Sequence, residues 1–498
     1  MRTSGILMPV FSLPSPHGIG TFGKAAFDFV DFLSEAGQSF WQILPLHPTG
    51  YADSPYQTLS TFAGNPYFID PILLSEEGLL TGDEINRFDF GNDPLRVNYG
   101  RLYESRFGLL RLAHRRFQSA PPPEYEAFCR EHADWLPDYS LFMAMKQCEG
   151  QRCFASWRKE WRERDPDSLA HARETLAEEI EFRNFMQFAF FSQWRRLKDY
   201  ANSRGIRIIG DVPIYVAYDS AEVWREPEQF QLDPDGIPSR VAGVPPDGFS
   251  EEGQLWGNPL YNWERMQREP EPFSWWKRRI RHALKLYDRI RLDHFRGFAS
   301  YYSIPFGEAT AKNGSWEKGP GMPFFRELEK ACGPLPIIAE DLGFLTPDVE
   351  RLLAKTGFPG MKVLQFAFDS REESDYLPHR YTQNSVVYTG THDNDTILGW
   401  ERSAPKADVE TARRYMHADG TEGLNWTMIR TAMMSVSDTA IFMMPDLVGL
   451  GSVARINTPA TSSGNWSWRL DGACLNSWLA GILRDMTALY GRLPAERS

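Results

Sequence analysis

Acidic side chains stand at the carboxyl ends of several short, β-rich runs in this chain of 498 residues. They are Asp211 in IIGDVPIYV, Asp293 in IRLDHFRG, Glu340 in PIIAEDLG, and Asp393 in the group His392, Asp393, Asn394, Asp395 of YTGTHDNDT. Any one of them could cap a helix or form a loop ion pair, but four at corresponding positions indicate a shared site. Carboxylates gathered on one face suit acid/base chemistry at an acetal, where an oxocarbenium-like transition state needs negative charge. The pattern therefore predicts glycoside chemistry.

A nearby arginine, Arg291, indicates the role of the Asp293 carboxylate. Arg291 precedes Asp293 by two positions, so on a strand both side chains point to the same side. A guanidinium at that distance lowers the carboxylate pKa and keeps the group ionised. We therefore predict that Asp293 is the nucleophile.

Glu340 has a different setting. It follows the apolar run 337–339, and a carboxyl group beside apolar walls and another carboxylate tends to stay protonated near neutral pH. Glu340 is therefore predicted to be the general acid and then the general base. Asp341 points to the other side of the strand, which favours a structural role, and Asp393 remains to bind sugar hydroxyls and to stabilise the developing charge.

Eight β-rich runs could position these side chains. They cover residues 39–45, 66–69, 206–212, 287–293, 336–340, 362–366, 386–391 and 440–444. Stretches with helical spacing lie between them, such as the stripe of Ala26, Phe29, Val30 and Leu33 and the stripe of Leu424, Met428, Ala432 and Met433. Alternation of strand and helix implies parallel strands in a closed barrel or a doubly wound sheet. Eight strands favour the barrel, so we predict an α/β fold, a (β/α)8 TIM barrel with helical insertions.

The interval between the second and third runs is far longer than the roughly 10 to 12 residues that a crossover needs. We therefore predict a mainly helical subdomain, residues 72–205, inserted into a single catalytic barrel that spans residues 1–498. Asp165 and Pro166 are typical of a helix start, and the run 169–200 is compatible with helix throughout. Its stripe of Phe182, Phe185, Met186 and Phe190 is predicted to lie in the core.

Composition excludes several functional classes. Lys and Arg total 54 against 66 Asp and Glu, a net charge of −12, so nucleic acid is not expected as a partner. Five cysteines without CxxC or His spacing predict no zinc site and free thiols in a reducing cytoplasm. The N-terminus does not have the pattern of a signal peptide, and no run of 18 apolar residues predicts a membrane span. The aromatic residues, 14% of the chain, could fill a core or line a ligand groove.

Two other patterns are weaker signals of binding. Asp233 and Asp235 in QLDPDGIPS match part of a calcium loop, but the later ligands are missing, so a turn is favoured. The glycines of HGIGTFG follow no strand and do not have the spacing of a dinucleotide fingerprint. We therefore expect neither a metal nor an organic cofactor.

Longer motifs give the chain a resemblance to a known family. They run from SLPSPHGIGTFG through QILPLHPT, DSPYQ, GNPYFIDP, GDVPIYV, GQLWGNPLYNW, RLDHFRG, IAEDLG, YTGTHDNDT and INTP to GNWSWR. In these motifs the chain resembles the 4-α-glucanotransferases called amylomaltase or disproportionating enzyme, glycoside hydrolase family 77 of the α-amylase clan. The resemblance implies a barrel without a separate C-terminal β-domain.

The resemblance also implies roles for individual residues. Asp293 matches the family's nucleophile, Glu340 its acid/base and Asp393, rather than Asp395, its transition-state stabiliser. The residues that it implies for substrate binding are Ser54, Tyr56, Asp211, Gln254, Trp256, Arg291, His294, His392 and Asn465. Gln254 and Trp256 belong to the region 226–262, which resembles the family's loop over the groove. Tyr56, Trp256 and Trp466 are candidates for stacking on glucose rings.

The expected reaction is a retaining double displacement on 1,4-α-glucans and maltooligosaccharides, with glucose or another sugar as the acceptor. The clan's usual histidine after Asp211 is absent, since residues 213–216 read PIYV, and this departure favours a transferase. One alternative is an α-amylase-type retaining hydrolase, in which water replaces the acceptor. A second is a glucan-binding protein on a barrel scaffold without turnover, although the presence of all three acids argues against it.

Overall fold

The computed structural model describes residues 2–246, 250–343, 345–371 and 374–495, and its centre is a closed barrel of parallel strands. Its order is β1-β12-β11-β10-β9-β6-β3-β2. The bounds are β1 (Thr3–Leu7), β2 (Phe40–Gln42), β3 (Arg207–Val212), β6 (Arg289–Leu292), β9 (Ile337–Ala339), β10 (Gly360–Val363), β11 (Ser385–Tyr388) and β12 (Thr439–Met443). The predicted (β/α)8 TIM barrel is therefore confirmed.

One of the eight predicted strands is wrong. Residues 66–69 do not form a strand, since Pro66–Phe68 is a turn of 3-10 helix that the Asn65 side chain caps by accepting from the Tyr67 N–H. The eighth strand is β1, which lies between β2 and β12 and is buried along its whole length. Pro9 and the prolines that follow obscured this strand in the sequence, because they end the apolar run soon after it begins.

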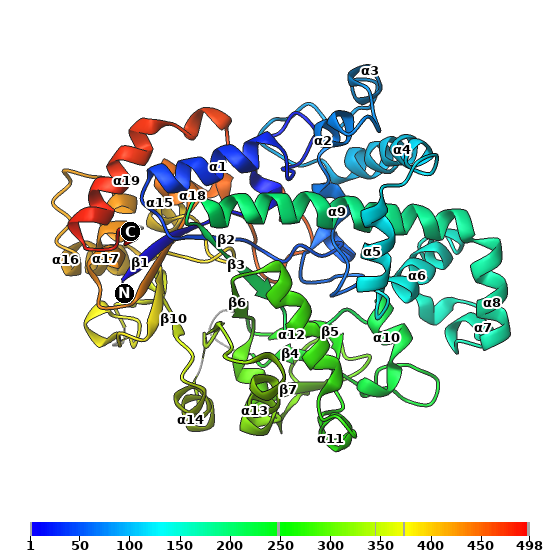
Figure 1. Cartoon of the computed structure of the whole chain (residues 1–498). Helices are drawn as coiled ribbons and strands as arrows, with labels where there is room; N and C mark the ends of the chain where they lie inside the picture. The colour runs from blue at the N-terminus through cyan, green and yellow to red at the C-terminus, as the bar shows by residue number, and fades with distance from the viewer. Residues whose placement is uncertain (1, 247–249, 344, 372–373, 496–498) are drawn as a thin grey trace.

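Helices surround the barrel (Figure 1). Their bounds are α1 (Lys24–Glu35), α10 (Ala221–Arg225), α11 (Trp263–Arg268), α12 (Ser274–Leu286), α13 (Gly321–Cys332), α14 (Pro347–Thr356), α15 (Ile397–Ser403), α16 (Lys406–Tyr415), α17 (Leu424–Met434), α18 (Met444–Val448) and α19 (Ser477–Leu489). Both predicted stripes are confirmed, since their residues in α1 and α17 are buried. The chain ends lie on one side of the barrel, where Arg492 donates to the Thr3 carbonyl at 2.9 Å.

The long interval between β2 and β3 is helical. It holds α2 (Pro71–Glu76), α3 (Gly82–Ile85), α4 (Tyr99–Phe117), α5 (Pro123–Glu131), α6 (Leu136–Cys148), α7 (Lys159–Arg162), α8 (Pro166–Thr175) and α9 (Ala177–Ser203). Asp165 caps α8, as predicted, but the helix does not continue unbroken through 169–200, because the backbone leaves the helical region at Leu176. The stripe that begins at Phe182 is buried in α9, as predicted.

Helix α9 belongs to two parts of the molecule at once. It contacts α4, α5, α6 and α8 in the region 72–205, and it also contacts α1 and β3 of the barrel. Figure 1 shows it running from the barrel out to α8. Because α9 leads directly into β3, it is also the crossover helix that returns the chain from β2 to β3.

A second sheet lies beside the barrel, with the order β5-β4-β7-β8. Its strands are β4 (Arg240–Val244), β5 (Gln254–Pro259), β7 (Ser300–Pro305) and β8 (Ser315–Lys318), all paired antiparallel. The region 226–262, predicted as a loop, is thus partly a strand pair that two later strands extend. In the turn before β4, the Asp233 side chain accepts from the N–H groups of Asp235 and Ile237, as the turn interpretation predicted.

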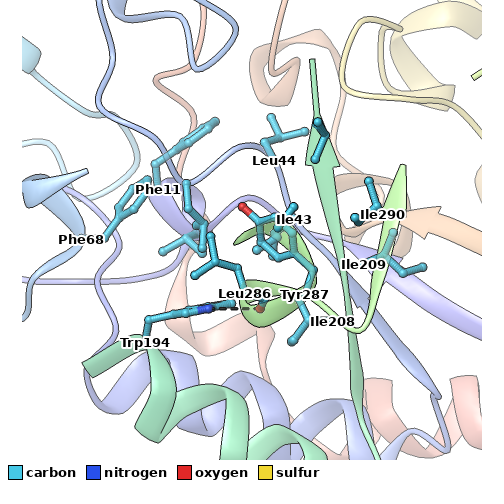
Figure 2. Close-up of a cluster of buried hydrophobic side chains, with 14 of the residues drawn as sticks. Phe11, Ile43, Leu44, Phe68, Trp194, Ile208, Ile209, Leu286, Tyr287 and Ile290 are labelled. Carbon is cyan, nitrogen blue, oxygen red and sulfur yellow. Dashed lines mark hydrogen bonds between the residues drawn. The ribbon is translucent and has the colours of Figure 1, made fainter. Parts of the chain in front are cut away.

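Buried apolar side chains join α9 and α12 to the barrel wall (Figure 2). Trp194 of α9 is 1% exposed, and its indole N–H donates to the Leu286 carbonyl at 3.2 Å. The labelled cluster is Phe11, Ile43, Leu44, Phe68, Trp194, Ile208, Ile209, Leu286, Tyr287 and Ile290. This packing fixes β3 and β6, whose carboxyl ends bear Asp211 and Asp293.

Within the described part of the chain, no helix combines the length and the apolar character needed to cross a membrane. Between Trp468 and residue 495 the described chain forms a 3-10 turn and α19, without a further strand.

We predict that Trp194→Ala lowers the free energy of unfolding by about 3–5 kcal/mol, because it leaves a cavity between α9 and the barrel. Trp194→Phe should cost less, about 1–3 kcal/mol, since it mainly leaves the Leu286 carbonyl without a partner. Urea denaturation would measure both changes. Trp478→Ala is the control, because that side chain is 75% exposed and its loss should change stability by less than about 0.5 kcal/mol. Equal effects at both tryptophans would contradict the prediction.

Candidate active site

A cavity of about 580 Å³ opens at the carboxyl ends of the barrel strands. Segments that follow β2, β3, β6, β9, β11 and β12 line it, together with β5 of the second sheet. Every predicted site residue except Asp211 is on its wall: Ser54, Tyr56, Gln254, Trp256, Arg291, Asp293, His294, Glu340, His392, Asp393 and Asn465. Carboxyl ends of barrel strands are where barrel enzymes place their chemistry.

The centre of this site is the guanidinium of Arg291, whose side chain is 4% exposed. Its Nη1 lies 2.7 Å from Asp211 Oδ2 and 2.9 Å from Asp293 Oδ1, and its Nη2 lies 3.9 Å from Glu340 Oε2. Burial alone would lower the pKa of Arg291, but the carboxylates of Asp211 and Asp293 raise it well above its ordinary value. Arg291 is therefore a permanent cation that three acidic groups share.

Asp211 was predicted to bind substrate, and it is the one predicted site residue that does not line the cavity. Its side chain is fully buried, beneath the cavity and not on its wall. Oδ2 accepts from the Tyr56 hydroxyl at 3.0 Å and from Arg291. Burial raises the pKa of Asp211 to about 7, and Arg291 opposes this shift. Asp211 thus holds Tyr56 and Arg291, which do line the cavity. The position of an acid at the end of a strand does not indicate whether it lines the cavity or supports residues that do.

Glu340 has the properties of a proton donor. Burial raises the pKa of Glu340 to about 8. The charge of Arg291 and a hydrogen bond from the His294 N–H lower the pKa, whereas the neighbouring Asp293 raises it further. That hydrogen bond is 2.5 Å long. His294 adopts a left-handed backbone conformation with φ 50°, a strained setting for a residue with a side chain, and this turn aims its N–H at Glu340.

The adjacent acid Asp341 points away from the site. Its Oδ1 accepts from the Met361 N–H at 2.6 Å and so joins the end of β9 to β10. Asp341 is not on the cavity wall. Its position agrees with the structural role predicted from strand alternation.

Asp393 reaches the cavity from the segment after β11. Its Oδ1 accepts from Asn457 Nδ2 at 2.6 Å, and its backbone carbonyl accepts from Arg455 Nη2 at 2.9 Å. Asp395, by contrast, accepts from the Ser452 hydroxyl and lies outside the cavity wall. Of the two acids that strand-end reasoning could not separate, the structure therefore brings Asp393 to the site.

Aromatic rings provide apolar faces beside these acids. Tyr56 stacks on His392 with centroids 5.1 Å apart, and Trp466 lies 5.8 Å from Tyr56. Trp256 meets His294 edge-on, with ring centroids 4.9 Å apart. Burial lowers the pKa of His392, and Asp393 partly offsets this shift. Rings with polar edges beside carboxylates suit a sugar, which has an apolar face and a rim of hydroxyls.

Several wall residues were not predicted. Gln57 donates to Asn258 Oδ1 and to the Trp256 carbonyl, both at 3.2 Å, and so joins two segments of the wall. Asn457 holds Asp393 and belongs to the INTP motif, which was noted without a role for its residues. The further wall residues are Ala52, Pro213, Ile214, Tyr215, Leu255, Leu342, Thr391, Thr458, Pro459, Ala460, Thr461 and Ser462. Amides and small residues outside strands carry no periodic signal, so only the motifs could have indicated them.

The arrangement can perform acid/base and nucleophilic chemistry with side chains alone. Across the described residues, no group of three or more His, Cys, Asp or Glu side chains could hold a metal ion. Glu340 has a raised pKa, and the Asp293 carboxylate is hydrogen-bonded to a guanidinium. Glu340 is thus set to give a proton, while the Asp293 carboxyl group is held in place by the guanidinium of Arg291.

Comparisons with known proteins agree with this chemistry. The sequence profile of a family described as 4-alpha-glucanotransferase matches residues 8–475. A 4-alpha-glucanotransferase of Thermus thermophilus is 48% identical over 503 residues, which cover 99% of each chain. One of Clostridium butyricum is 46% identical over 487 residues, covering 97% of this chain and all of the relative. A solved amylomaltase of Streptococcus agalactiae in complex with acarbose is 43% identical, with a TM-score of 0.96, covering 99% of this chain and all of that one.

We predict that Asp293→Asn lowers the pKa of Glu340, because the negative charge of Asp293 is one of the causes that raise it. A pH titration of the Glu340 carboxyl carbon by NMR would measure the shift. Asp233→Asn is the control, since Asp233 lies in an exposed turn and its substitution should leave the pKa of Glu340 unchanged. A pKa of Glu340 that stays constant or rises in Asp293→Asn would refute the proximity of the two charges.

Proposed function

The chain belongs to the 4-alpha-glucanotransferases, glycoside hydrolase family 77, and from this premise we propose how its cavity carries out transfer. Segments of 1,4-α-glucans pass to the 4-hydroxyl of an acceptor glucose or maltooligosaccharide by a retaining double displacement. The observation that carries the proposal is the sharing of Arg291 between a hydrogen-bonded carboxylate, Asp293, and a carboxyl group of raised pKa, Glu340.

In the first step, Asp293 attacks the anomeric carbon of the donor glucan. Glu340 gives its proton to the glycosidic oxygen, so the bond to the leaving sugar breaks as the bond to Asp293 Oδ forms. The negative charge of Asp393 stabilises the oxocarbenium-like transition state. Arg291 holds Asp293 in position for this attack through its hydrogen bond of 2.9 Å.

In the second step, Glu340 acts as the base. It takes the proton from the 4-hydroxyl of the acceptor, whose oxygen attacks the anomeric carbon and releases Asp293. Two inversions restore the α configuration, and Glu340 regains its proton. The electron pairs and the proton therefore balance over the cycle without a cofactor.

The substrate-binding residues are proposed from their places on the wall. Tyr56, His392 and Trp466 form one ring surface, and Trp256 with His294 forms another. Ser54, Gln254 and Asn465 also line this cavity with polar side chains. Rings beside polar groups support a maltooligosaccharide as the ligand, and a related amylomaltase is solved with acarbose.

The hydrolase alternative differs only in the last acceptor. The curated relatives and the matching family are named for transfer, so transfer is favoured over net hydrolysis. A glucan-binding protein without turnover is disfavoured for the same reason. We further propose that the barrel is a single catalytic unit, with the region 72–205 as its helical subdomain and 226–262 over the groove. The five cysteines are all free, which supports a cytoplasmic location.

We predict that the protein converts maltotriose into glucose and a ladder of longer maltooligosaccharides, with little net gain in reducing ends. The physical reason is that the acceptor 4-hydroxyl, rather than water, opens the glucosyl-Asp293 intermediate. Chromatography of the products beside a reducing-end assay would measure both. Reducing ends that rise in step with the products, without longer oligosaccharides, would favour the hydrolase.

We predict that Asp293→Ala abolishes turnover and that Glu340→Gln lowers kcat about 10²- to 10⁴-fold, since it removes the transferable proton. Binding of maltooligosaccharides to Asp293→Ala, followed by calorimetry, should persist. Asp395→Asn is the matched control on the segment of Asp393: its side chain lies outside the cavity wall, and its kcat should stay near that of the wild type. Undiminished turnover in Asp293→Ala would eliminate it as the nucleophile.

A further inference from the structure

A buried arginine lies behind the cavity, outside the groups already assigned. Arg279 is on α12, which packs against β3 and β6. Its side chain is 2% exposed, and its guanidinium lies over the rings of Trp275 and Trp276, 5.5 and 4.8 Å from their centroids. Burying a cation is costly unless polar groups surround it, so its partners indicate what the burial achieves.

The partners of Arg279 come from three separate segments of the chain. Nη2 donates to the Pro213 carbonyl at 2.5 Å and Nη1 to the Ile214 carbonyl at 3.1 Å, both in the segment after β3. Nε donates to Thr61 Oγ1 at 2.8 Å, in the segment after β2. Nη1 also lies 3.4 Å from the Tyr261 hydroxyl, which itself donates to the Ile214 carbonyl at 2.8 Å. One guanidinium therefore joins the segments that follow β2, β3 and β5.

The carbonyls that Arg279 holds belong to the wall of the cavity. Pro213 and Ile214 both line it. The Ile214 side chain packs against Gly297, where Cδ1 lies 2.7 Å from the place that a Cβ would take. Gly297 in turn donates its N–H to the His294 carbonyl at 2.9 Å. Ile214 thus supports the turn that aims the His294 N–H at Glu340.

The same segment also supports wall residues from two other segments. The Val216 carbonyl accepts from Asn258 Nδ2 at 2.9 Å, and Asn258 Oδ1 accepts from Gln57 at 3.2 Å. Both Asn258 and Gln57 line the cavity. A shift of the segment 213–216 would therefore displace these wall residues as well as the turn beside Glu340.

We propose that Arg279 is a positioning residue for glucan transfer, which fixes the Pro213 and Ile214 carbonyls and through them the turn that orients Glu340. The inference rests on the proposed function of this site. A planar guanidinium suits the task, because its donors reach three segments at fixed angles, whereas an ammonium is a single compact charge. Burial lowers the pKa of Arg279, and Tyr261, Glu222 and Asp293 oppose that shift.

The test compares Arg279→Met and Arg279→Lys with the wild type in maltotriose transfer. Arg279→Met should lower kcat about 10²-fold, as expected for catalytic groups displaced by about 1 Å, with a much smaller change in KM, because the residues that contact the sugar all remain. Arg279→Lys should recover part of the lost kcat, since its ammonium can still hold one or two of the carbonyls. A residue that merely stabilised the fold would not separate kcat from KM in this way.

Arg492→Met is the matched control. Arg492 is also fully buried and donates to backbone carbonyls, including those of Thr3 and Ser437, but it lies at the amino ends of the barrel strands. Its substitution should lower the melting temperature and leave the kcat of the folded protein unchanged. A wild-type kcat in Arg279→Met, or losses of kcat that follow the melting temperature equally in both variants, would overturn the inference.

If Arg279→Met does not fold, Tyr261→Phe tests whether the contacts of Arg279 position the catalytic groups. It removes only the hydroxyl that shares the Ile214 carbonyl with Arg279, and it should lower kcat several-fold while the melting temperature changes little. An unchanged kcat in Tyr261→Phe would then overturn the proposal. If the wild-type protein makes no oligosaccharides longer than maltotriose, the proposed function itself is overturned. Failure of the proposed function can therefore be distinguished from failure of the inference about Arg279.

Discussion

The shared guanidinium of Arg291 is the interaction on which the rest of the site depends. A cation buried at the end of β6 needs polar partners, and Asp211, Asp293 and Glu340 supply carboxyl groups from three adjacent strands. Because the guanidinium is planar and its donors are fixed, it sets the spacing of all three acids. Their electrostatic difference follows from this geometry: Asp293 is hydrogen-bonded to Arg291, whereas Glu340 lies farther from it and is more deeply desolvated.

This arrangement requires the parallel barrel. Only parallel strands bring the residues that follow β3, β6, β9 and β11 to one face, where segments distant in the sequence meet. The fold therefore supplies the proximity of the acids, and the loops supply the ring surfaces and the amides that would hold a sugar. The transfer chemistry of the family thus depends on a few residues at the ends of the barrel strands. The rest of the chain holds those strand ends in place.

The barrel and the acid-bearing strand ends could be predicted because their signals are local. Apolar runs that end in a charged residue identify β3, β6, β9 and β11, and helical stripes identify α1 and α17. Signals that depend on distant partners were missed. Prolines follow strand β1, so its pairing with β2 and β12 is what defines it. The apolar run at 66–69 became a 3-10 turn through the Asn65 cap. Burial of Asp211 likewise depends on Tyr56, which lies 155 residues away, and no spacing within a strand can report that.

Helix α9 belongs both to the region 72–205 and to the barrel, so the two parts cannot change independently in evolution. A subdomain joined to a barrel by two flexible linkers can be exchanged or deleted as a cassette. Here the last helix of the region 72–205 is also the barrel's own crossover helix, and Trp194 anchors it to the barrel wall. Excision of that region would remove the connection that makes β2 and β3 parallel neighbours. The helical region and the barrel are therefore bound to vary together, by substitution along α9, rather than by exchange of a module.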